Sequence, residues 1–288
     1  MFIAKDLTDY QVLDTGDGMK LENWNGVLLS RPDPQVIWPK TSPNLWQKAD
    51  AVYHRSETGG GDWETFNKSI PERWTFNYKG LKMVVRPTGF KHTGIFPEQA
   101  ANWDWIREKI KESGKHEPKV LNLFGYTGGA SLAALSAGAS VVHVDAAKSM
   151  IDWFKENLAL SNLDRKPVRY IVDDCLKFVQ REQRRGSTYD AIIMDPPSYG
   201  RGKNGEVWKM DKDIYNLIVE CTKLLSRDPI FFLINSYTTG LSHVVMDNML
   251  LKTVAAKYKG KVKGDVLVLP VENSKTYLPC GTASRWER

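Results

Sequence analysis

The clearest fold signal in the chain is KVLNLFGYTGGASLAALSAGASVVHVD, residues 119–145. It begins with a short apolar run, KVLNLF (119–124), which is typical of a buried strand. A glycine-rich turn and a run of small, helix-forming residues follow, and SVVHVD (140–145) then predicts a second strand that ends in an acid. A strand, a glycine turn, a helix and a second strand in this order indicate the start of a doubly wound α/β sheet.

The same alternation continues along the rest of the chain. Three more strands are predicted, with helical patterns between them: VRYIVDD (168–174), YDAIIMD (189–195) and PIFFLINS (229–236). Such alternation favours a parallel sheet that helices cover on both faces. The last two strands, near 265–271 and 282–286, have no helix between them and therefore predict a hairpin. We expect a Rossmann-like sheet of seven strands, parallel except for a terminal antiparallel strand, within residues 118–288.

The first part of the chain has a different character. Over residues 1–88, short segments rich in Val, Leu, Trp and Tyr are broken by turns such as TGDG (15–18) and GGGD (59–62). This pattern predicts a small antiparallel β domain. Residues 89–117 are expected to form a connecting segment with a helix that begins near Pro97.

Composition excludes several classes of protein. With 288 residues, 42% hydrophobic and 26% charged, the chain is neither disordered nor fibrous. No apolar run approaches the length of a membrane span, and the N-terminus does not resemble a secretory signal, so we expect a cytoplasmic protein without a membrane partner. The three cysteines lack the spacing of a disulfide framework or a metal site, and no metal is expected. The net charge of +6 is compatible with a polyanionic partner.

Candidate ligand-binding residues follow the first two strands. The turn contains Phe124, Gly125, Tyr126, Thr127 and Gly128. An acid ends the second strand twenty residues after the first glycine of the turn, where its carboxylate can accept hydrogen bonds from a ribose. That acid and its neighbour are Asp145 and Ala146. The arrangement predicts a nucleoside-containing cofactor, either a nicotinamide dinucleotide or S-adenosylmethionine. The spacing G-x-x-G-G departs from the GxGxxG of dinucleotide-binding loops.

Acids also end the third and fourth strands. Asp174 is placed to reach an adenine amino group, and its alternative role is to cap the helix expected at 175–185. Asp195, Pro196 and Pro197 follow the fourth strand. The two prolines lack N–H donors and hold the chain extended, so their carbonyls are available to orient an amino group while Asp195 faces a positive charge on the cofactor. A simple Asp-Pro-Pro turn is the alternative.

Several of these segments together resemble a known family. VLNLFGYTGG, the acid of VVHVD, the VDD-C run, MDPPSYGRG and the terminal strand pair are similar to class I S-adenosylmethionine-dependent methyltransferases. LNLF-x-YTGG with DPP resembles, more narrowly, the bacterial large-subunit ribosomal RNA methyltransferases and their uncharacterised relatives. The resemblance implies S-adenosylmethionine as cofactor, S-adenosylhomocysteine as product and RNA as partner. GFKHTGIFPEQ (89–99) is similar to the segment that closes over the cofactor in such enzymes, which implies contacts from Phe96 and Gln99.

The fifth strand bears on the atom that is methylated. Methylation of a pyrimidine carbon-5 needs a cysteine thiolate, but Asn235, Ser236 and Tyr237 occupy the expected place. A nitrogen acceptor, which needs positioning rather than a covalent intermediate, is therefore favoured, with Asp195, Pro196 and Pro197 as the catalytic residues. Four residues after them are candidates for binding substrate by stacking or by phosphate contacts: Tyr199, Arg201, Lys203 and Trp208. The alternative for Tyr199 is packing in the core or on the surface. The last three belong to a segment over 200–210 that is either a mobile cover over the substrate or an ordinary flexible loop.

Our interpretation is a methyltransferase that acts on RNA, with ribosomal RNA as the expected acceptor. Three alternatives remain open from the sequence: an NAD-dependent oxidoreductase, a methyltransferase of a small molecule or protein, and a non-catalytic RNA-binding or assembly factor that retains the cofactor fold. The pattern does not decide between a monomer and a homodimer.

Overall fold

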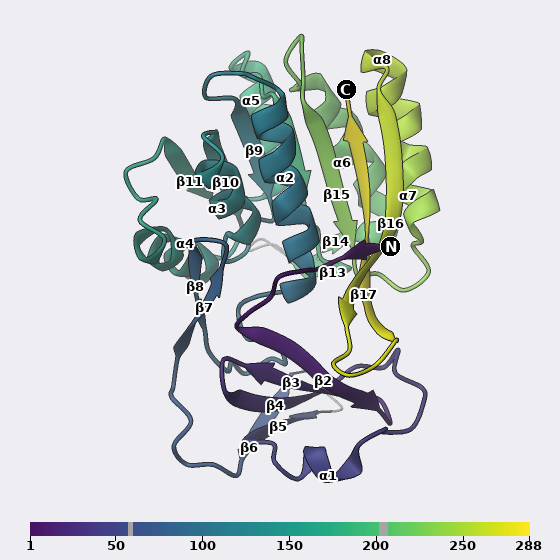
Figure 1. Ribbon diagram of the computed structural model, residues 1–288. Helices are drawn as coiled ribbons and strands as arrows, with labels where there is room; N and C mark the ends of the chain where they lie inside the picture. Colours follow the sequence, from purple (N-terminus) through teal and green to yellow (C-terminus); the bar gives the residue numbers. More distant parts are fainter. Residues whose placement is uncertain (57–59, 202–206) are drawn as a thin grey trace. The chain divides into compact units, whose positions relative to one another are not determined.

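The computed structural model describes residues 1–56, 60–201 and 207–288. Within them the chain forms two compact units (Figure 1). The larger unit contains Asn102–Leu267 together with Met1–Phe2 and Gly281–Arg288, and the smaller unit contains Ile3–Ala101 with Val268–Cys280. The domain boundaries expected at residues 88 and 117 stay a prediction.

The larger unit is built on a mixed sheet with the order β1-β16-β17-β15-β12-β9-β10-β11. Its central pairs, β11 with β10, β10 with β9, β9 with β12 and β12 with β15, are parallel, and β17 runs antiparallel to β15. The predicted doubly wound sheet is thereby confirmed. The strands are β1 (Phe2–Ile3), β9 (Lys119–Leu123), β10 (Ser140–Asp145), β11 (Val168–Val172), β12 (Ala191–Met194), β15 (Phe231–Ser236), β16 (Lys261–Pro270) and β17 (Tyr277–Glu287).

The expected count of seven strands is wrong by one, because the described part of the sheet has eight. The additional strand is β1, which lies at the edge beyond β16. It contains two residues, too few to show any alternation of polar and apolar side chains. The sequence therefore carries no signal for it.

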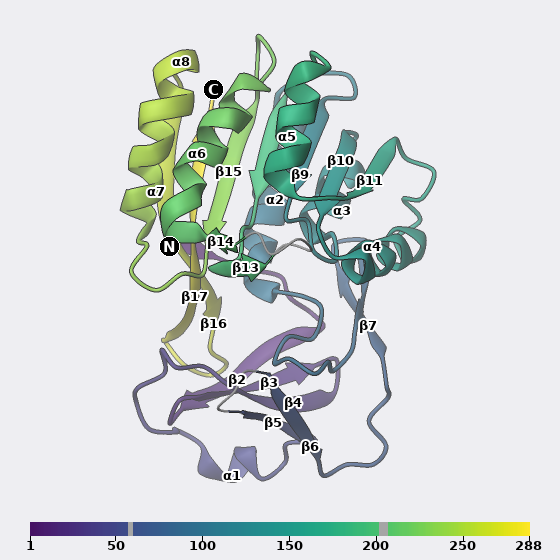
Figure 2. The same ribbon diagram turned by 180° about the vertical axis from the view of Figure 1, so that it is seen from behind.

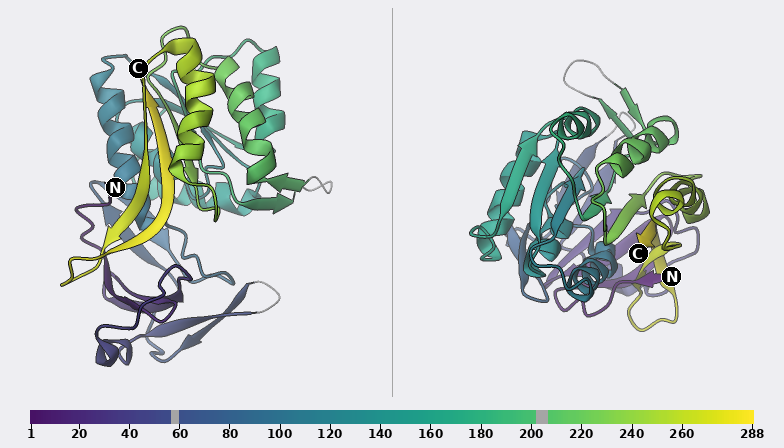
Figure 3. Two further views of the ribbon diagram at one scale, coloured as in Figure 1. Left: turned by 90° about the vertical axis from the view of Figure 1, so that its right-hand side faces the viewer. Right: turned by 90° about the horizontal axis from the view of Figure 1, so that it is seen from above.

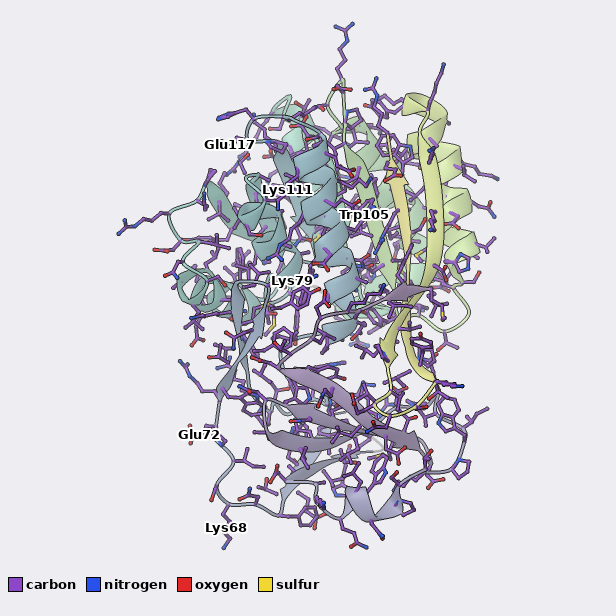
Figure 4. All side chains as sticks on the ribbon, in the orientation of Figure 1. Lys68, Glu72, Lys79, Trp105, Lys111 and Glu117 are labelled. Carbon is purple, nitrogen blue, oxygen red and sulfur yellow. The ribbon has the colours of Figure 1, made fainter. Side chains whose placement is uncertain are left out.

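Helices cover both faces of this sheet (Figures 1 and 2; Figure 3, right). Along β15, Phe232 and Ile234 belong to the buried cluster shared with α5, α6 and α7. Phe231 points to the other face, where its ring centroid is 5.0 Å from that of Trp105. Trp105 belongs to α2 (Figure 4). The helices are α2 (Ala100–Glu112), α3 (Gly129–Ser136), α4 (Lys148–Leu160), α5 (Cys175–Arg184), α6 (Met210–Lys223) and α7 (His243–Leu250), which continues through a π-turn, η2 (Leu251–Ala255), into α8 (Ala256–Tyr258).

The topology singles out one edge of the sheet. From β9 the chain moves outward to β10 and β11, and it then returns to β12 on the other side of β9. In sheets of this kind, ligands bind outside the carboxyl ends of the strands at the point where the order reverses. The segments that follow β9, β10, β11 and β12 come together there.

The smaller unit holds a five-stranded sheet in the order β2-β3-β4-β5-β6 and a separate β7–β8 pair, within the described residues. The expectation of a purely antiparallel domain is wrong for one pair, because β4 and β5 are parallel. Residues 33–50 form a crossover that returns the chain in the same direction. The elements are β2 (Tyr10–Gly16), β3 (Met19–Trp24), β4 (Val27–Pro32), α1 (Pro43–Trp46), β5 (Ala51–Arg55), β6 (Gly61–Thr65), β7 (Trp74–Tyr78), β8 (Leu81–Val85) and η1 (Pro97–Gln99).

A buried ion pair lies inside this smaller unit. The carboxylate of Glu22 accepts hydrogen bonds from the Tyr10 hydroxyl and from Arg31 Nη2, each at 2.6 Å. Burial acts to raise the pKa of Glu22, but the positive charges of Arg31 and Lys20 outweigh it and hold that pKa at about 2. Glu22 is therefore ionised at neutral pH although no part of it is exposed.

Candidate active site

The turn after β9 has an unusual backbone. Phe124 and Tyr126 have positive φ angles of 54° and 52°, and Gly128, which precedes α3, has a φ of 95°. The amide of Gly125 donates to the carbonyl of Val144 at 3.0 Å, which holds the turn against β10. Left-handed conformations at non-glycine residues are strained and persist where the surroundings impose them.

The glycines of this turn are required by the side chains beneath it. A Cβ atom at Gly125 would lie 2.3 Å from Cε1 of His143, and one at Gly128 would lie 2.0 Å from Cδ2 of Phe154. Both distances are far inside van der Waals contact. The absence of side chains at these positions therefore allows the turn to approach β10 and α4, whatever it also does for a ligand.

A hydrogen-bonded chain supports the turn from below. Asn122 Nδ2 donates to Ser131 Oγ at 2.9 Å, and Ser131 Oγ lies 2.9 Å from Nδ1 of His143. Burial lowers the pKa of His143 to about 3, so its imidazole is neutral, and the ring stacks on Phe154 with centroids 3.9 Å apart. This chain was not predicted, although Asn122, a polar residue in the middle of a buried strand, is a signal for it in the sequence.

Asp145 ends β10 beside this turn. Its Oδ2 accepts a hydrogen bond from the Tyr126 amide and its Oδ1 accepts one from the Ala147 amide, each at 2.9 Å. Burial raises the pKa of Asp145, and the two backbone donors oppose that rise. A carboxylate offers about four acceptor positions, so Asp145 retains capacity for the hydroxyls of a ribose. Ala146, which follows it, is exposed.

Two further acids follow β11. Asp174 is the N-cap of α5, because its Oδ1 accepts a hydrogen bond from the Lys177 amide at 2.9 Å. Asp173 forms an ion pair with Arg181. The capping role considered for Asp174 is thus present in the structure, and its contact with an adenine stays a prediction.

Asp195, Pro196 and Pro197 follow β12 at the same edge. The Asp195 amide donates to the carbonyl of Leu123 in β9 at 3.4 Å. Pro196 is buried and Pro197 is exposed. The carbonyl of Pro197 accepts a hydrogen bond of 2.7 Å from the indole N–H of Trp208, so one of the carbonyls expected to be available already has a donor.

The stretch 199–209, for which the sequence leaves open a substrate-binding cover or an ordinary flexible loop, is a β-ribbon in its described parts. β13 (Tyr199–Arg201) pairs antiparallel with β14 (Val207–Lys209), and the two strands lie near the end of β15 (Figure 2). The pairing joins residues 199–201 to residues 207–209, so the local run of glycines and lysines does not indicate it. Arg201 Nε donates to the hydroxyl of Tyr199 at 2.8 Å, and Tyr199 is 50% exposed. Lys203 lies outside the described residues.

Phe96 and Gln99 belong to the smaller unit. The ring of Phe96 lies 4.9 Å from that of His92, and Gln99 is buried at the end of η1. Their proposed contact with the cofactor stays a prediction. In the larger unit, Cys175 and Cys221 are buried in the core, and burial raises the pKa of both thiols, which makes them unsuitable as nucleophiles.

The residues at this edge suit S-adenosylmethionine. Asp145, Asp174 and Asp195 place three carboxylates after β10, β11 and β12. These groups can accept hydrogen bonds from ribose hydroxyls and an amino group, and they complement the positive charge of a sulfonium. Together with the departure of the glycine turn from GxGxxG, these acceptors favour the sulfonium cofactor over NAD.

Comparison with known proteins agrees with this assignment. The family model described as S-adenosylmethionine-dependent methyltransferase matches residues 51–240. The chain belongs to this family. A solved S-adenosylmethionine-dependent methyltransferase from Agrobacterium tumefaciens is 37% identical to it with a TM-score of 0.93, covering 99% of this chain and 92% of that one. A methyltransferase fold solved in complex with S-adenosylhomocysteine has a TM-score of 0.72 at 22% identity, covering 97% of this chain and 76% of that one.

Curated relatives carry a more specific name, ribosomal RNA large subunit methyltransferase K/L. The protein of Shewanella sp. strain MR-4 is 32% identical over 255 residues, which are 85% of this chain and 32% of the relative. That of strain ANA-3 is 33% identical over 208 residues, or 69% of this chain and 27% of the relative. The methyltransferase thus spans about a third of the length of these relatives. Among its described residues, no helix is long and apolar enough to cross a membrane, and no group of three or more His, Cys, Asp or Glu side chains could hold a metal.

Proposed function

We propose that this methyltransferase methylates a nitrogen of an RNA base, with ribosomal RNA as the acceptor. The observation that carries the proposal is the position of Asp195, Pro196 and Pro197 directly before a ribbon that bears Tyr199 and Arg201. The names of the curated relatives and the net charge of +6 support RNA over other acceptors. A ribosomal acceptor would also place the enzyme in the cytoplasm.

The cofactor supplies an electrophilic methyl group on a sulfonium, and the chain supplies its binding site. Asp145 accepts hydrogen bonds from the ribose hydroxyls, since its two backbone donors leave acceptor positions on both oxygens. The turn of residues 124–128 and Ala146 would surround the cofactor, and Asp174 would bind the adenine amino group. The carboxylate of Asp195 would complement the positive charge of the sulfonium.

The acceptor nitrogen is positioned by the strand end. Asp195 and the Pro196 carbonyl accept hydrogen bonds from the amino group, because Trp208 already donates to the carbonyl of Pro197. These bonds would direct the nitrogen lone pair at the methyl group for an in-line displacement, in which the N–C bond forms as the C–S bond breaks and S-adenosylhomocysteine leaves. The proton lost from the nitrogen would pass to the Asp195 carboxylate that accepts its hydrogen bond. The buried thiols of Cys175 and Cys221 support nitrogen over carbon-5 as the target.

The acceptor base and its backbone are bound by the ribbon. Tyr199 is half exposed and presents an aromatic face on which a base can stack. Arg201, held beside that ring by its hydrogen bond to the Tyr199 hydroxyl, presents a guanidinium suited to phosphate. Lys203 lies between the two strands of the ribbon in sequence and would add to this positive charge.

The test is transfer of labelled methyl groups from S-adenosylmethionine to RNA, protein and small-molecule fractions of a strain that lacks the gene. We expect label in ribosomal RNA, and we expect Asp195→Ala to lower it by at least about a hundredfold. Asp152→Ala, which removes an exposed acid on α4, is the matched control and retains the label. Label in protein or small molecules alone would refute the RNA acceptor, and cofactor binding without label in any fraction would refute transfer.

A further inference from the structure

We propose that Trp208 is a positioning residue that joins the acceptor end of β12 to the cofactor turn after β9. The inference rests on the proposed function and assigns Trp208 a different task from contact with RNA. Its indole makes two contacts with separate parts of the site. The N–H donates to the Pro197 carbonyl at 2.7 Å, and the ring centroid lies 5.3 Å from that of Phe124.

The first contact supplies a hydrogen-bond donor to the end of the Asp-Pro-Pro segment. Pro196 and Pro197 have no N–H groups, so hydrogen bonds can hold the segment only through its carbonyls and through Asp195. Their rings lock φ, and Pro197 also restricts ψ of Pro196, so ψ of Pro197 is the free angle. The Asp195 amide anchors the start of the segment on Leu123, and the Trp208 N–H anchors its end. With both ends tied, the groups that orient the acceptor nitrogen are held in place.

The second contact reaches the cofactor side of the site. Phe124 has a left-handed backbone with φ of 54°, a conformation that must be imposed by its surroundings. Its ring packs at 47° to the indole, and both side chains lie against the buried core of α5, α6 and α7. Two residues further on, the Tyr126 amide binds Asp145. By holding Phe124 in place, Trp208 therefore also helps to hold the Asp145 carboxylate, which we assign to the ribose.

Two variants separate these contacts. Trp208→Phe keeps an aromatic ring against Phe124 and removes the N–H, so we expect an unchanged Kd for S-adenosylmethionine and a kcat lower by about tenfold or more. Trp208→Leu removes both contacts, and we expect the Kd to rise by about three- to tenfold in addition. Calorimetry with S-adenosylmethionine gives the Kd, and methyl transfer to RNA gives kcat and KM.

A matched control is available in the smaller unit. The indole N–H of Trp63 donates to the Thr88 carbonyl at 2.9 Å, and its ring lies 5.3 Å from that of Tyr53. Trp63→Phe therefore removes the same kind of bond in the other unit, and we expect it to leave both Kd and kcat unchanged.

The outcomes separate the two proposals. If Trp208→Leu binds S-adenosylmethionine as tightly as the wild type, or if Trp63→Phe lowers kcat as much as Trp208→Phe does, the positioning role is wrong. If the wild type transfers no methyl group to RNA, the proposed acceptor is wrong, while the Kd values still decide the role of Trp208.

Discussion

Substituting Gly125 by alanine tests whether the glycine turn is shaped by its protein neighbours. The new Cβ would lie 2.3, 2.4 and 2.8 Å from three atoms of the His143 imidazole. That ring cannot easily move, because it stacks on Phe154 at 3.9 Å and is hydrogen-bonded to Ser131 at 2.9 Å. Overpacking of this kind costs about 1–3 kcal/mol, and we expect Gly125→Ala to lower the free energy of unfolding by that amount or more.

The same reasoning predicts a partial rescue. His143→Ala alone should cost about 2–4 kcal/mol, because it leaves a cavity and removes the partner of Ser131. In the double variant the alanine methyl at position 125 meets no imidazole, so the two losses should not add. We expect the double variant to be about 1–3 kcal/mol more stable than the sum of the single variants predicts.

Urea unfolding at neutral pH measures all four proteins of this cycle, and titration with S-adenosylmethionine measures the cofactor affinity of each. Gly89→Ala is the control, since a Cβ at Gly89 would meet nothing within 4 Å. Losses that add in the double variant would refute the clash. A Gly125→Ala protein that is as stable as the wild type but binds the cofactor weakly would show that the glycine serves the ligand alone.

Three further predictions concern other groups. In the wild type, two backbone N–H groups donate to the Asp145 carboxylate, and in Asp145→Asn the new side-chain NH2 group would face one of these donors. We therefore expect calorimetry to show a cofactor affinity at least about tenfold lower. Burial acts to raise the pKa of Glu22, but Arg31 and Lys20 hold it at about 2, below the ordinary value of 4.5. The stability that ionised Glu22 provides is therefore complete above about pH 4.5 and is lost as the pH falls through about 2. Glu22→Gln should accordingly lower the free energy of unfolding by about 3–5 kcal/mol at neutral pH, and the difference from the wild type should disappear as the pH falls below about 2. Unfolding measured across an acid titration checks this, and a difference that stays the same at every pH would contradict it. Replacing all three cysteines by alanine should keep methyl transfer within about threefold of the wild type, whereas a loss of roughly a hundredfold would indicate a covalent intermediate.

The fold was predictable wherever local patterns determine it. The alternation of strands and helices from residue 119 predicts the doubly wound sheet, and the missing helix before residue 282 predicts the final hairpin. Pairing between distant segments was not predictable. The edge strand Phe2–Ile3 is too short to show a pattern, and the parallel pair of β4 and β5 depends on where the crossover of residues 33–50 returns.

The candidate site was likewise predictable only where the local sequence determines it. Asp145 and Asp195 could be found from the sequence, because each directly follows a buried strand whose carboxyl end lies at the topological switch point. The bond from Trp208 to Pro197 could not, since it depends on how a ribbon folds back across the strand end. The support of Gly125 by His143 likewise exists only after β10 is placed beside β9.

Most residues of the glycine and acid motifs also have a structural task, and this changes what the motifs demonstrate. Gly125 makes room for an imidazole, Asp174 caps a helix, and Asp145 holds two backbone amides. Any one of them would be retained by a protein that bound no cofactor, so none is evidence of methyl transfer by itself. What a structural role does not require is the placement of acids at the carboxyl ends of three strands of one sheet, beside an Asp-Pro-Pro segment whose two prolines have no N–H groups. Asp145 and Asp174 keep acceptor positions beyond those that their backbone donors occupy, and these positions suit a ligand that carries hydroxyl and amino groups.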